Sequence, residues 1–366
     1  MALLPPDHPP VLPEKVGVLL IALGTPDSPN YWDMRRYLKE FLSDQRVIEV
    51  NPIFWQILLN VVILTKRPFS SGEAYRSIWD EERDESPLRT ITREQSEKLG
   101  KTLSERFGDG VIVDYGMRYG SPSTASKIKA LQDQGCQRIV IFPLYPQYAA
   151  ATTGTACDQA FRALMKIRWQ PAVRTVPAYY DHPGYIEALA NSVRRHLASL
   201  DWQPDVLVSS FHGVPKRYLL AGDPYHCQCQ KTARLLRESL GWSEEQLQIA
   251  FQSLFGKEEW LRPYTVEHVA DLAKKGHKNI AIIAPGFSAD CVETLEEIQE
   301  EIREAFEEAG GEKFAYIPCL NAEQEHIDLL ADITTRELSG WVEAIDGLNA
   351  TAQPGPTLAA VSGGRA

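Results

Sequence analysis

The 366-residue chain lacks the features that define several classes of protein. Six cysteines are too few for a disulfide scaffold of this length, and their closest spacing is Cys227-x-Cys229, with no C-x-x-C. Lys and Arg total 38 against 49 Asp and Glu, and the formal charge of −11 disfavours a nucleic-acid partner. The longest apolar run, residues 53–64, is shorter than the roughly 20 residues that a membrane span needs. With no apolar signal-peptide region near Met1, these observations predict a cytoplasmic protein.

Seven short, β-branched runs alternate with helical patterns. Near-continuous apolar runs between helices predict parallel strands covered on both faces, which is an α/β architecture. The runs are 16–23, 111–116, 138–144, 206–211, 248–253, 279–285 and 314–318. The sequence has no G-x-G-x-x-G after the first run and no P-loop motif. The usual signatures of dinucleotide and nucleoside triphosphate binding are therefore absent. Ligands bind beyond the carboxyl ends of parallel strands, so we expect the chemistry in the turns that follow these runs.

An internal repeat predicts two similar domains. TASKIKALQDQGCQRIVIF, from Thr124, aligns with TVEHVADLAKKGHKNIAII, from Thr265, at an offset of 141. Each copy has the pattern of a helix, a glycine cap and a buried strand. Any helix–glycine–strand unit has this pattern, and that simpler explanation stays open.

A second alignment indicates an insertion in the first domain. LLIALGTP (19–26) and VLVSSFHGVP (206–215) align at an offset of 189, which sets Leu23 opposite His212. The two offsets differ by about 48 residues, and the apolar run 53–64 falls within that excess. We therefore expect two Rossmann-like domains, the first of which carries an apolar insertion.

The predicted organisation has four parts. They are a flexible lead (1–15), a first Rossmann-like domain (16–172), a second Rossmann-like domain (173–345) and a disordered tail (346–366). The tail is assigned from its small, polar, Pro- and Gly-marked composition.

His212 lies directly after a predicted strand, in the Gly-Pro turn of SSFHGVPKRYLLAGDPY (209–225). A histidine at the carboxyl end of a strand is exposed and can bind a metal ion or move a proton. A turn histidine without a chemical role is the alternative.

Four glutamates follow the turn at Pro285 on a predicted helix. Glu293, Glu297, Glu300 and Glu304 are spaced to share one helical face. Such a run usually means a solvated face, although like charges four residues apart destabilise a helix by roughly 0.2–0.5 kcal/mol per pair. The alternative is a carboxylate ladder that passes divalent cations or protons, since hard cations prefer oxygen ligands.

Aromatic and arginine side chains follow three other strands. Arg118, Tyr145, Tyr148 and Trp260 occupy such positions, where they would suit a flat, anionic, aromatic ligand. Each of them taken singly also fits an ordinary core or surface position.

Three of these segments together resemble the ferrochelatase family. Residues 209–225, PLYPQYAAATTG (143–154) and PGFSADCVETLEEI (285–298) match three family blocks in the family's order, within a resemblance that spans about residues 16–345. The resemblance implies a lyase that inserts Fe(II) into protoporphyrin IX in the last step of haem synthesis. It also implies that the porphyrin lies in the cleft between two Rossmann-like domains. Coproporphyrin as substrate, a cobalt or nickel chelatase, and a two-domain tetrapyrrole-binding protein remain as alternatives.

The same resemblance assigns roles to individual residues. His212 and Glu293 correspond to the catalytic, iron-site pair, and run 53–64 corresponds to an apolar lip that meets the membrane. The implied partners are protoporphyrin IX, Fe(II), and the membrane or the preceding enzyme of the haem pathway. The porphyrin-contacting positions are Leu23, Arg67, Tyr75, Ser86, Arg118 and Trp260.

The chain departs from the family's animal members at their [2Fe–2S] ligands. Those members supply one cysteine from the Pro-Gln-Tyr block and three from near the C-terminus, whereas Ala149 and Ala150 stand here and no cysteine follows Cys319. Cys227 and Cys229 have no two further ligands nearby in the sequence. We therefore expect no cluster and no required cofactor.

Overall fold

Two parallel sheets of four strands each form the centre of the protein in this computed structural model, which describes residues 7–8 and 11–342. The strand orders are β2-β1-β3-β4 and β6-β5-β7-β8, so the two sheets have the same connectivity. The strands are β1 (Lys15–Thr25), β2 (Val111–Gly120), β3 (Cys136–Pro143), β4 (Ala172–Thr175), β5 (Val206–His212), β6 (Leu247–Gln252), β7 (Asn279–Ile283) and β8 (Lys313–Ile317). The α/β prediction is confirmed, and all seven predicted runs are strands.

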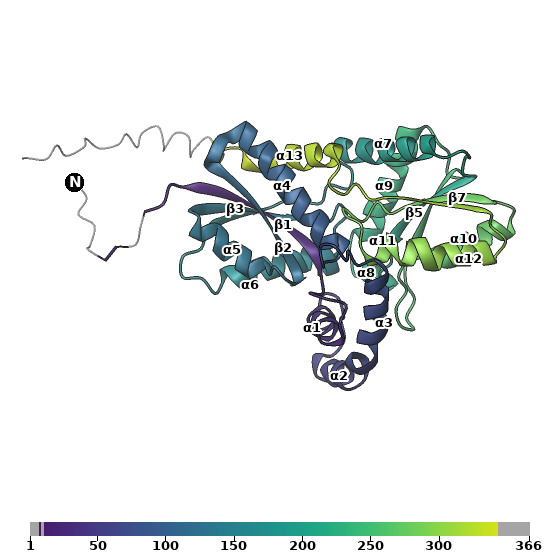
Figure 1. The fold of residues 1–366 in the computed structure, drawn as a ribbon, viewed down its shortest axis with the longest axis horizontal. Coiled ribbons are helices and arrows are strands. Elements are labelled where there is room, and N and C mark those ends of the chain that lie inside the picture. The colour runs from purple at the N-terminus through teal and green to yellow at the C-terminus, as the bar shows by residue number, and fades with distance from the viewer. Residues whose placement is uncertain (1–6, 9–10, 343–366) are drawn as a thin grey trace, which may run out of the picture.

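Helices cover both faces of each sheet (Figure 1). The α-helices are α1 (Tyr31–Leu42), α2 (Pro52–Leu58), α3 (Leu64–Ser77), α4 (Pro87–Phe107), α5 (Thr124–Asp133), α6 (Thr155–Leu164), α7 (Pro183–Ser199), α8 (Lys216–Leu220), α9 (Tyr225–Leu240), α10 (Thr265–Lys274), α11 (Val292–Leu295), α12 (Arg303–Glu308) and α13 (Gln324–Leu338). Three π-helical segments, η1 (Leu59–Ile63), η3 (Ala150–Gly154) and η4 (Glu297–Ile302), and the 3₁₀ turn η2 (Gly108–Gly110) complete the set.

The central strands explain why the sequence shows continuous apolar runs. Val18 and Leu20 of β1, like Leu207 and Val208 of β5, are fully buried. Because helices cover both faces of a parallel sheet, successive side chains are buried whichever face they point to. The alternation of a half-exposed strand therefore never appears in these runs.

The two halves repeat each other as the sequence alignment indicates. α5 and α10 each have ten residues and begin at the aligned Thr124 and Thr265. Gly135 and Gly276 follow them with φ angles of 94° and 98°, a conformation that favours glycine after a helix. Each helix then leads into the strand at the third position of its sheet, which is β3 in the first sheet and β7 in the second.

The extra residues of the first half form a helical projection beside the two sheets (Figure 1). α1, α2, η1 and α3 lie between β1 and α4, whereas only α8 stands between β5 and α9. This insertion has its own small core, in which Met34, Trp55 and Leu59 are buried. The apolar run 53–64 lies at its tip.

The ends of the predicted domains need adjustment. The predicted boundary after 172 cuts β4, which pairs with β3 through Thr175 and so belongs to the first sheet. β4 gave no sequence signal because AVRT has four residues and sits at a sheet edge. α13 then returns to the first half and packs on α4 and β3 as well as on α7. The predicted tail 346–366 lies outside the described residues, as does most of the predicted lead 1–15.

Candidate active site

A cavity of about 970 Å³ opens at the carboxyl ends of β5 and β6, facing the insertion. The helices of the insertion form one wall, and residues 253–258, Trp260 and the glutamates of α11 and η4 form another. Five of the predicted site residues line it, and they come from positions far apart in the sequence. They are Arg67, Tyr75, His212, Trp260 and Glu293.

His212 is the last residue of β5 and lies opposite Gln252 in the register with β6. Its Nδ1 is 2.6 Å from the carbonyl oxygen of Gly213, a contact that is favourable only if Nδ1–H donates. That tautomer leaves Nε2 with a free lone pair. Gly213 is required here because a Cβ would lie 2.8 Å from the Gln252 carbonyl oxygen. The close packing of this turn thus holds the imidazole at the strand end.

Glu297, which the sequence placed only in a charged run, is the carboxylate most firmly held at this site. It accepts hydrogen bonds from the backbone N–H of Ser253 at 2.7 Å and from Nε2 of Gln252 at 3.1 Å. Burial raises the pKa of Glu297, while the Ser253 hydrogen bond and the nearby His212 act in the opposite direction. Gln252 also donates to the backbone carbonyl of Glu293 at 2.7 Å, so it ties both glutamates to the strand that pairs with His212.

The prediction that four glutamates share one helical face is wrong beyond Glu297. The sequence assumed one continuous α-helix, but α11 ends at Leu295 and η4 is π-helical, with wider turns. The cavity is therefore lined by Glu293, Glu296, Glu297 and Glu301. Glu300 and Glu304 are exposed and lie outside the cavity lining.

Glu296 has the clearest electrostatic signature of these glutamates. Burial, followed by the negative charges of Glu301 and Glu300, raises its pKa to about 7. A carboxyl group with such a pKa exchanges protons near neutral pH.

The charge of Glu293 acts on three buried tyrosines, of which two belong to the insertion and one follows β3. Burial raises the pKa values of Tyr37, Tyr75 and Tyr145, and the charge of Glu293 adds to each shift. The phenols therefore remain neutral and can act only as hydrogen-bonding groups.

The structure does not bring three predicted porphyrin contacts to the cavity lining. Leu23 is half-buried and packs against the core of the insertion. Ser86 is buried and caps α4 by accepting a hydrogen bond from the backbone N–H of Arg89. Arg118 faces a separate polar hollow of about 720 Å³.

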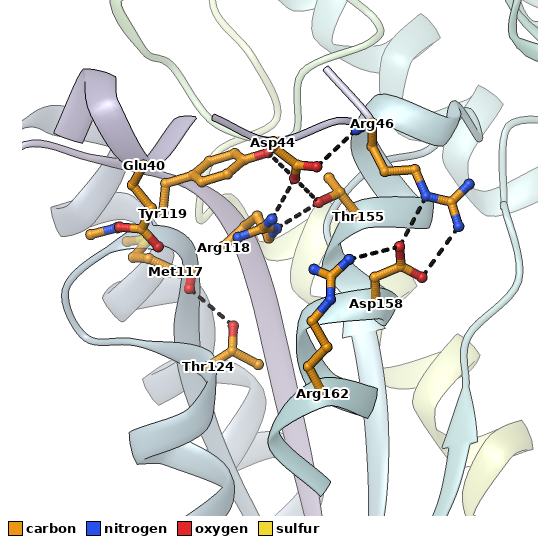
Figure 2. Close-up of polar contacts among 11 residues, drawn as sticks. Glu40, Asp44, Arg46, Met117, Arg118, Tyr119, Thr124, Thr155, Asp158 and Arg162 are labelled. Atoms are coloured by element: carbon orange, nitrogen blue, oxygen red, sulfur yellow. Dashed lines mark hydrogen bonds and ion pairs between the residues drawn. The ribbon is translucent and has the colours of Figure 1, made fainter. Parts of the chain in front are cut away.

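The guanidinium of Arg118 takes part in a network of internal polar contacts (Figure 2). It forms an ion pair with Asp44, and its Nε donates to Oγ1 of Thr155 at 2.6 Å. Asp44 also accepts from the Tyr119 hydroxyl at 2.8 Å. Burial acts to raise the pKa of Asp44, but the hydrogen bonds from Thr155 and the backbone of Arg46, with the Arg118 charge, lower it overall. A single aspartate in a loop offers no sequence signal for this role.

The described part of the chain holds no group of three or more His, Cys, Asp or Glu side chains placed to bind a metal ion. Its six cysteines are unpaired, and Cys227 is exposed whereas Cys229 is buried. Within the same residues, no helix is both long enough and apolar enough to cross a membrane.

Paired sheets of identical connectivity place this chain in the chelatase fold class. SirB from Bacillus subtilis with Fe3+ superposes with a TM-score of 0.52 at 11% identity, over 90% of this chain and 98% of that one. The sirohydrochlorin chelatase SirB from Bacillus subtilis subspecies spizizenii, in complex with cobalt, gives 0.50 at 10% identity, over 89% and 97%. At such identities the likeness concerns the fold alone.

Sequence comparison then identifies the family. The profile of the family described as Ferrochelatase matches residues 15–338. Proteins named ferrochelatase are 62% identical in Rhodobacter capsulatus, over 93% of this chain and 97% of the relative, and 57% identical in Agrobacterium fabrum, over 93% and 99%. The chain belongs to the ferrochelatase family, and it is a metal chelatase of the lyase class in haem biosynthesis.

Proposed function

We propose that this protein inserts Fe(II) into protoporphyrin IX to form protohaem, with His212 and Glu293 at the metal. The observation that carries the proposal is one cavity in which an imidazole, several aromatic rings and a wall of glutamates from α11 and η4 meet. A porphyrin is a flat aromatic ring whose carboxylates lie at one edge. Arg67 and Lys257 offer positive charge at the cavity wall, and neither forms an ion pair within the described residues.

Proton removal falls to His212. A free porphyrin carries two pyrrole protons that must leave before a metal can occupy the ring. The Nε2 lone pair of His212 accepts one of them, and the imidazolium so formed is stabilised by Glu297 nearby. The second proton passes to a carboxylate of the same cavity, for which Glu293 is the candidate. Glu297 itself stays in place because Ser253 and Gln252 hold it.

Ring distortion would come from the cavity walls. Metal insertion requires a pyrrole nitrogen to tilt its lone pair out of the ring plane. Contacts with the ring faces and edges, made by residues such as Trp260 and Tyr75, would supply roughly 1–5 kcal/mol of strain from binding.

Iron delivery falls to the glutamates of α11 and η4. Fe(II) accepts oxygen and imidazole ligands, and Glu293, Glu296, Glu297 and Glu301 offer oxygen atoms along one wall. The carboxyl group of Glu296, with its pKa of about 7, is suited to exchanging a proton for a cation near neutral pH.

A Soret-band assay tests the proposal and its alternatives. Purified protein is given Fe(II) or Zn(II) with protoporphyrin or coproporphyrin under anaerobic conditions. We expect insertion of both metals into protoporphyrin, with coproporphyrin slower because its two extra carboxylates meet an acidic wall. Faster turnover of coproporphyrin would assign that substrate instead, and binding without insertion would leave a tetrapyrrole-binding protein.

The insertion would also dock on a membrane surface, as a peripheral contact of a cytoplasmic protein. Its tip exposes apolar side chains on α2, η1 and α3, which are elements that also contribute residues to the cavity lining. The exposed side chains are Ile53, Phe54, Ile57, Val61, Val62 and Phe69. Burial in a bilayer surface would stabilise such a patch by roughly 25 cal/mol per Å². The preceding enzyme of the haem pathway is the other partner that this patch would suit.

We infer further that the protein needs no [2Fe–2S] cluster, because the positions that hold one in animal members carry no cysteine. Anaerobically purified protein should contain no acid-labile sulfide. Stoichiometric sulfide would contradict this inference.

A further inference from the structure

Two walls of the cavity are joined by the side chain of one arginine. Arg217 on α8 donates from Nη1 to Glu49 of the insertion and from Nε to Glu258 at 3.0 Å. All three residues line the cavity. We call this group, Glu49, Arg217 and Glu258, the clasp.

The first wall is the strap, residues 43–50, which connects α1 to α2. Its beginning is fixed because Asp44 is buried in the network with Arg118 and Tyr119. Its far end is held to the second half of the protein through the clasp and through the Tyr218 hydroxyl, which donates to the carbonyl of Val47 at 3.1 Å.

The second wall is the loop, residues 253–258. Ser253 and Gly256 have φ angles of 65° and 80°, and the backbone N–H groups of 254–258 make no hydrogen bond to another main-chain carbonyl in the described structure. The loop tip is instead held by side chains, through Glu258 to Arg217 and through Phe255, whose ring centroid lies 5.4 Å from the Arg67 guanidinium.

We propose that Arg217 is a gating residue of the cavity: it clasps the strap to the loop across the cavity mouth, and the two walls part when a porphyrin enters or leaves. This inference rests on the proposed porphyrin substrate. A rigid macrocycle cannot thread past closed walls, and loop opening of this kind limits many enzymes. The clasp partners are 40–47% exposed, so the ion pairs are weak enough to open repeatedly and are sensitive to salt.

The neighbouring ion pair provides a matched control. Lys216 precedes Arg217 on α8 and pairs with Glu259 at 3.1 Å, at similar exposure. Neither Lys216 nor Glu259 lines the cavity. Lys216→Gln therefore removes a comparably exposed ion pair, between α8 and the residue that follows the loop, without touching the clasp.

Stopped-flow porphyrin fluorescence, without metal, separates a gate from a ligand contact. Glu49→Gln and Glu258→Gln should each raise the association and the dissociation rate of protoporphyrin by about twofold to fivefold, the range that one exposed ion pair supports. The dissociation constant should change less than twofold, and Lys216→Gln should alter neither rate. Added salt should speed both rates in the wild type and have less effect in the Glu49→Gln/Glu258→Gln double variant.

Two results would overturn the gate. Tighter binding in Glu49→Gln together with weaker binding in Arg217→Gln would mean that Arg217 binds a substrate carboxylate. Rates equal to those of Lys216→Gln would mean that the clasp restrains nothing.

A measurement without porphyrin keeps the inference separate from the proposed function. Hydrogen exchange of the ligand-free protein should quicken in both 45–50 and 254–258 when Glu49 or Glu258 is changed to glutamine. Exchange confined to the mutated segment would contradict coupling of the two walls. A wild type that binds no porphyrin, by contrast, would refute the proposed function while leaving this result to decide on the clasp.

Discussion

At the residue scale, His212 has a geometry that suits proton transfer better than it suits structural support. One ring nitrogen contacts the Gly213 carbonyl, and among the described residues the imidazole forms no other hydrogen bond. His212→Ala should therefore leave the fold intact and lower metal insertion by at least about 10²-fold, as expected for a lost acid–base group. Steady-state insertion and porphyrin fluorescence titration measure the two effects. His196→Ala on α7, far from the cavity lining, is the control; near-normal turnover of the His212 variant would refute its role.

Glu296 predicts an unusual dependence of stability on pH. Its folded-state pKa of about 7 exceeds the ordinary value of 4.5, so the folded protein holds a proton that the unfolded chain releases between these pH values. Its contribution to the free energy of unfolding therefore falls as pH rises through this window. Glu296→Gln should stabilise the protein at pH 8 by about 1 kcal/mol, allowing for solvent screening, and hardly at all at pH 5.

Thermal or urea denaturation at the two pH values measures this difference. Glu308→Gln, at an exposed position in α12, serves as the control and should show no such pH dependence. Equal stabilisation of the Glu296 variant at pH 5 and pH 8 would exclude the titration as its cause.

At the scale of elements, the π-helical turn η4 changes which glutamates matter. Glu301 lines the cavity, whereas its neighbour Glu300 does not. If this wall carries iron or protons, Glu293→Gln should lower turnover most, and Glu301→Gln should lower it more than Glu300→Gln does. Measurements of kcat/KM for Fe(II) and Zn(II) insertion decide the order. An α-helical register would instead give Glu300 the larger effect.

The tip of the insertion combines a surface and a core in one short helix. Phe54 and Ile57 are 63% and 62% exposed, whereas Trp55 is buried and donates from Nε1 to the carbonyl of Leu42 at 2.6 Å. Phe54→Ser/Ile57→Ser should keep the thermal stability and weaken liposome binding, with little effect of salt. Trp55→Ala should cost about 3–5 kcal/mol of stability instead.

Liposome co-sedimentation and thermal denaturation of the two variants measure these outcomes. The sequence alone grouped Phe54, Trp55 and Leu58 as one lip, but only the first of them is strongly exposed. Undiminished liposome binding by the Phe54/Ile57 variant would remove the membrane role from this patch.

At the scale of the whole molecule, the architecture could be predicted from the sequence, but the side-chain contacts of the site could not. Buried strands leave continuous apolar runs and duplication leaves a repeat, so both sheets and the position of the insertion could be predicted. His212 and Glu293 were candidates from the strand-end turn and the glutamate run, and the structure places both in the cavity lining. Their iron-site role came from the resemblance and stays a prediction. The cavity-lining register of η4 could not be predicted, since a π-helical turn breaks the 3.6-residue period without changing composition. Arg118 was taken for a ligand contact because its buried partner, Asp44, lies 74 residues away in the sequence.

The return of α13 to the first half has a consequence for how the chain is made. Arg106, Arg138 and Arg174 of the first half reach Thr335, Trp341 and Ser339 near the end of the described chain. A ribosome releases the N-terminal half first, yet α13, which covers α4 and β3, emerges only after the whole second sheet. Until then, part of the first half's apolar surface lacks its cover, so the nascent protein has to wait for α13 before that half is complete.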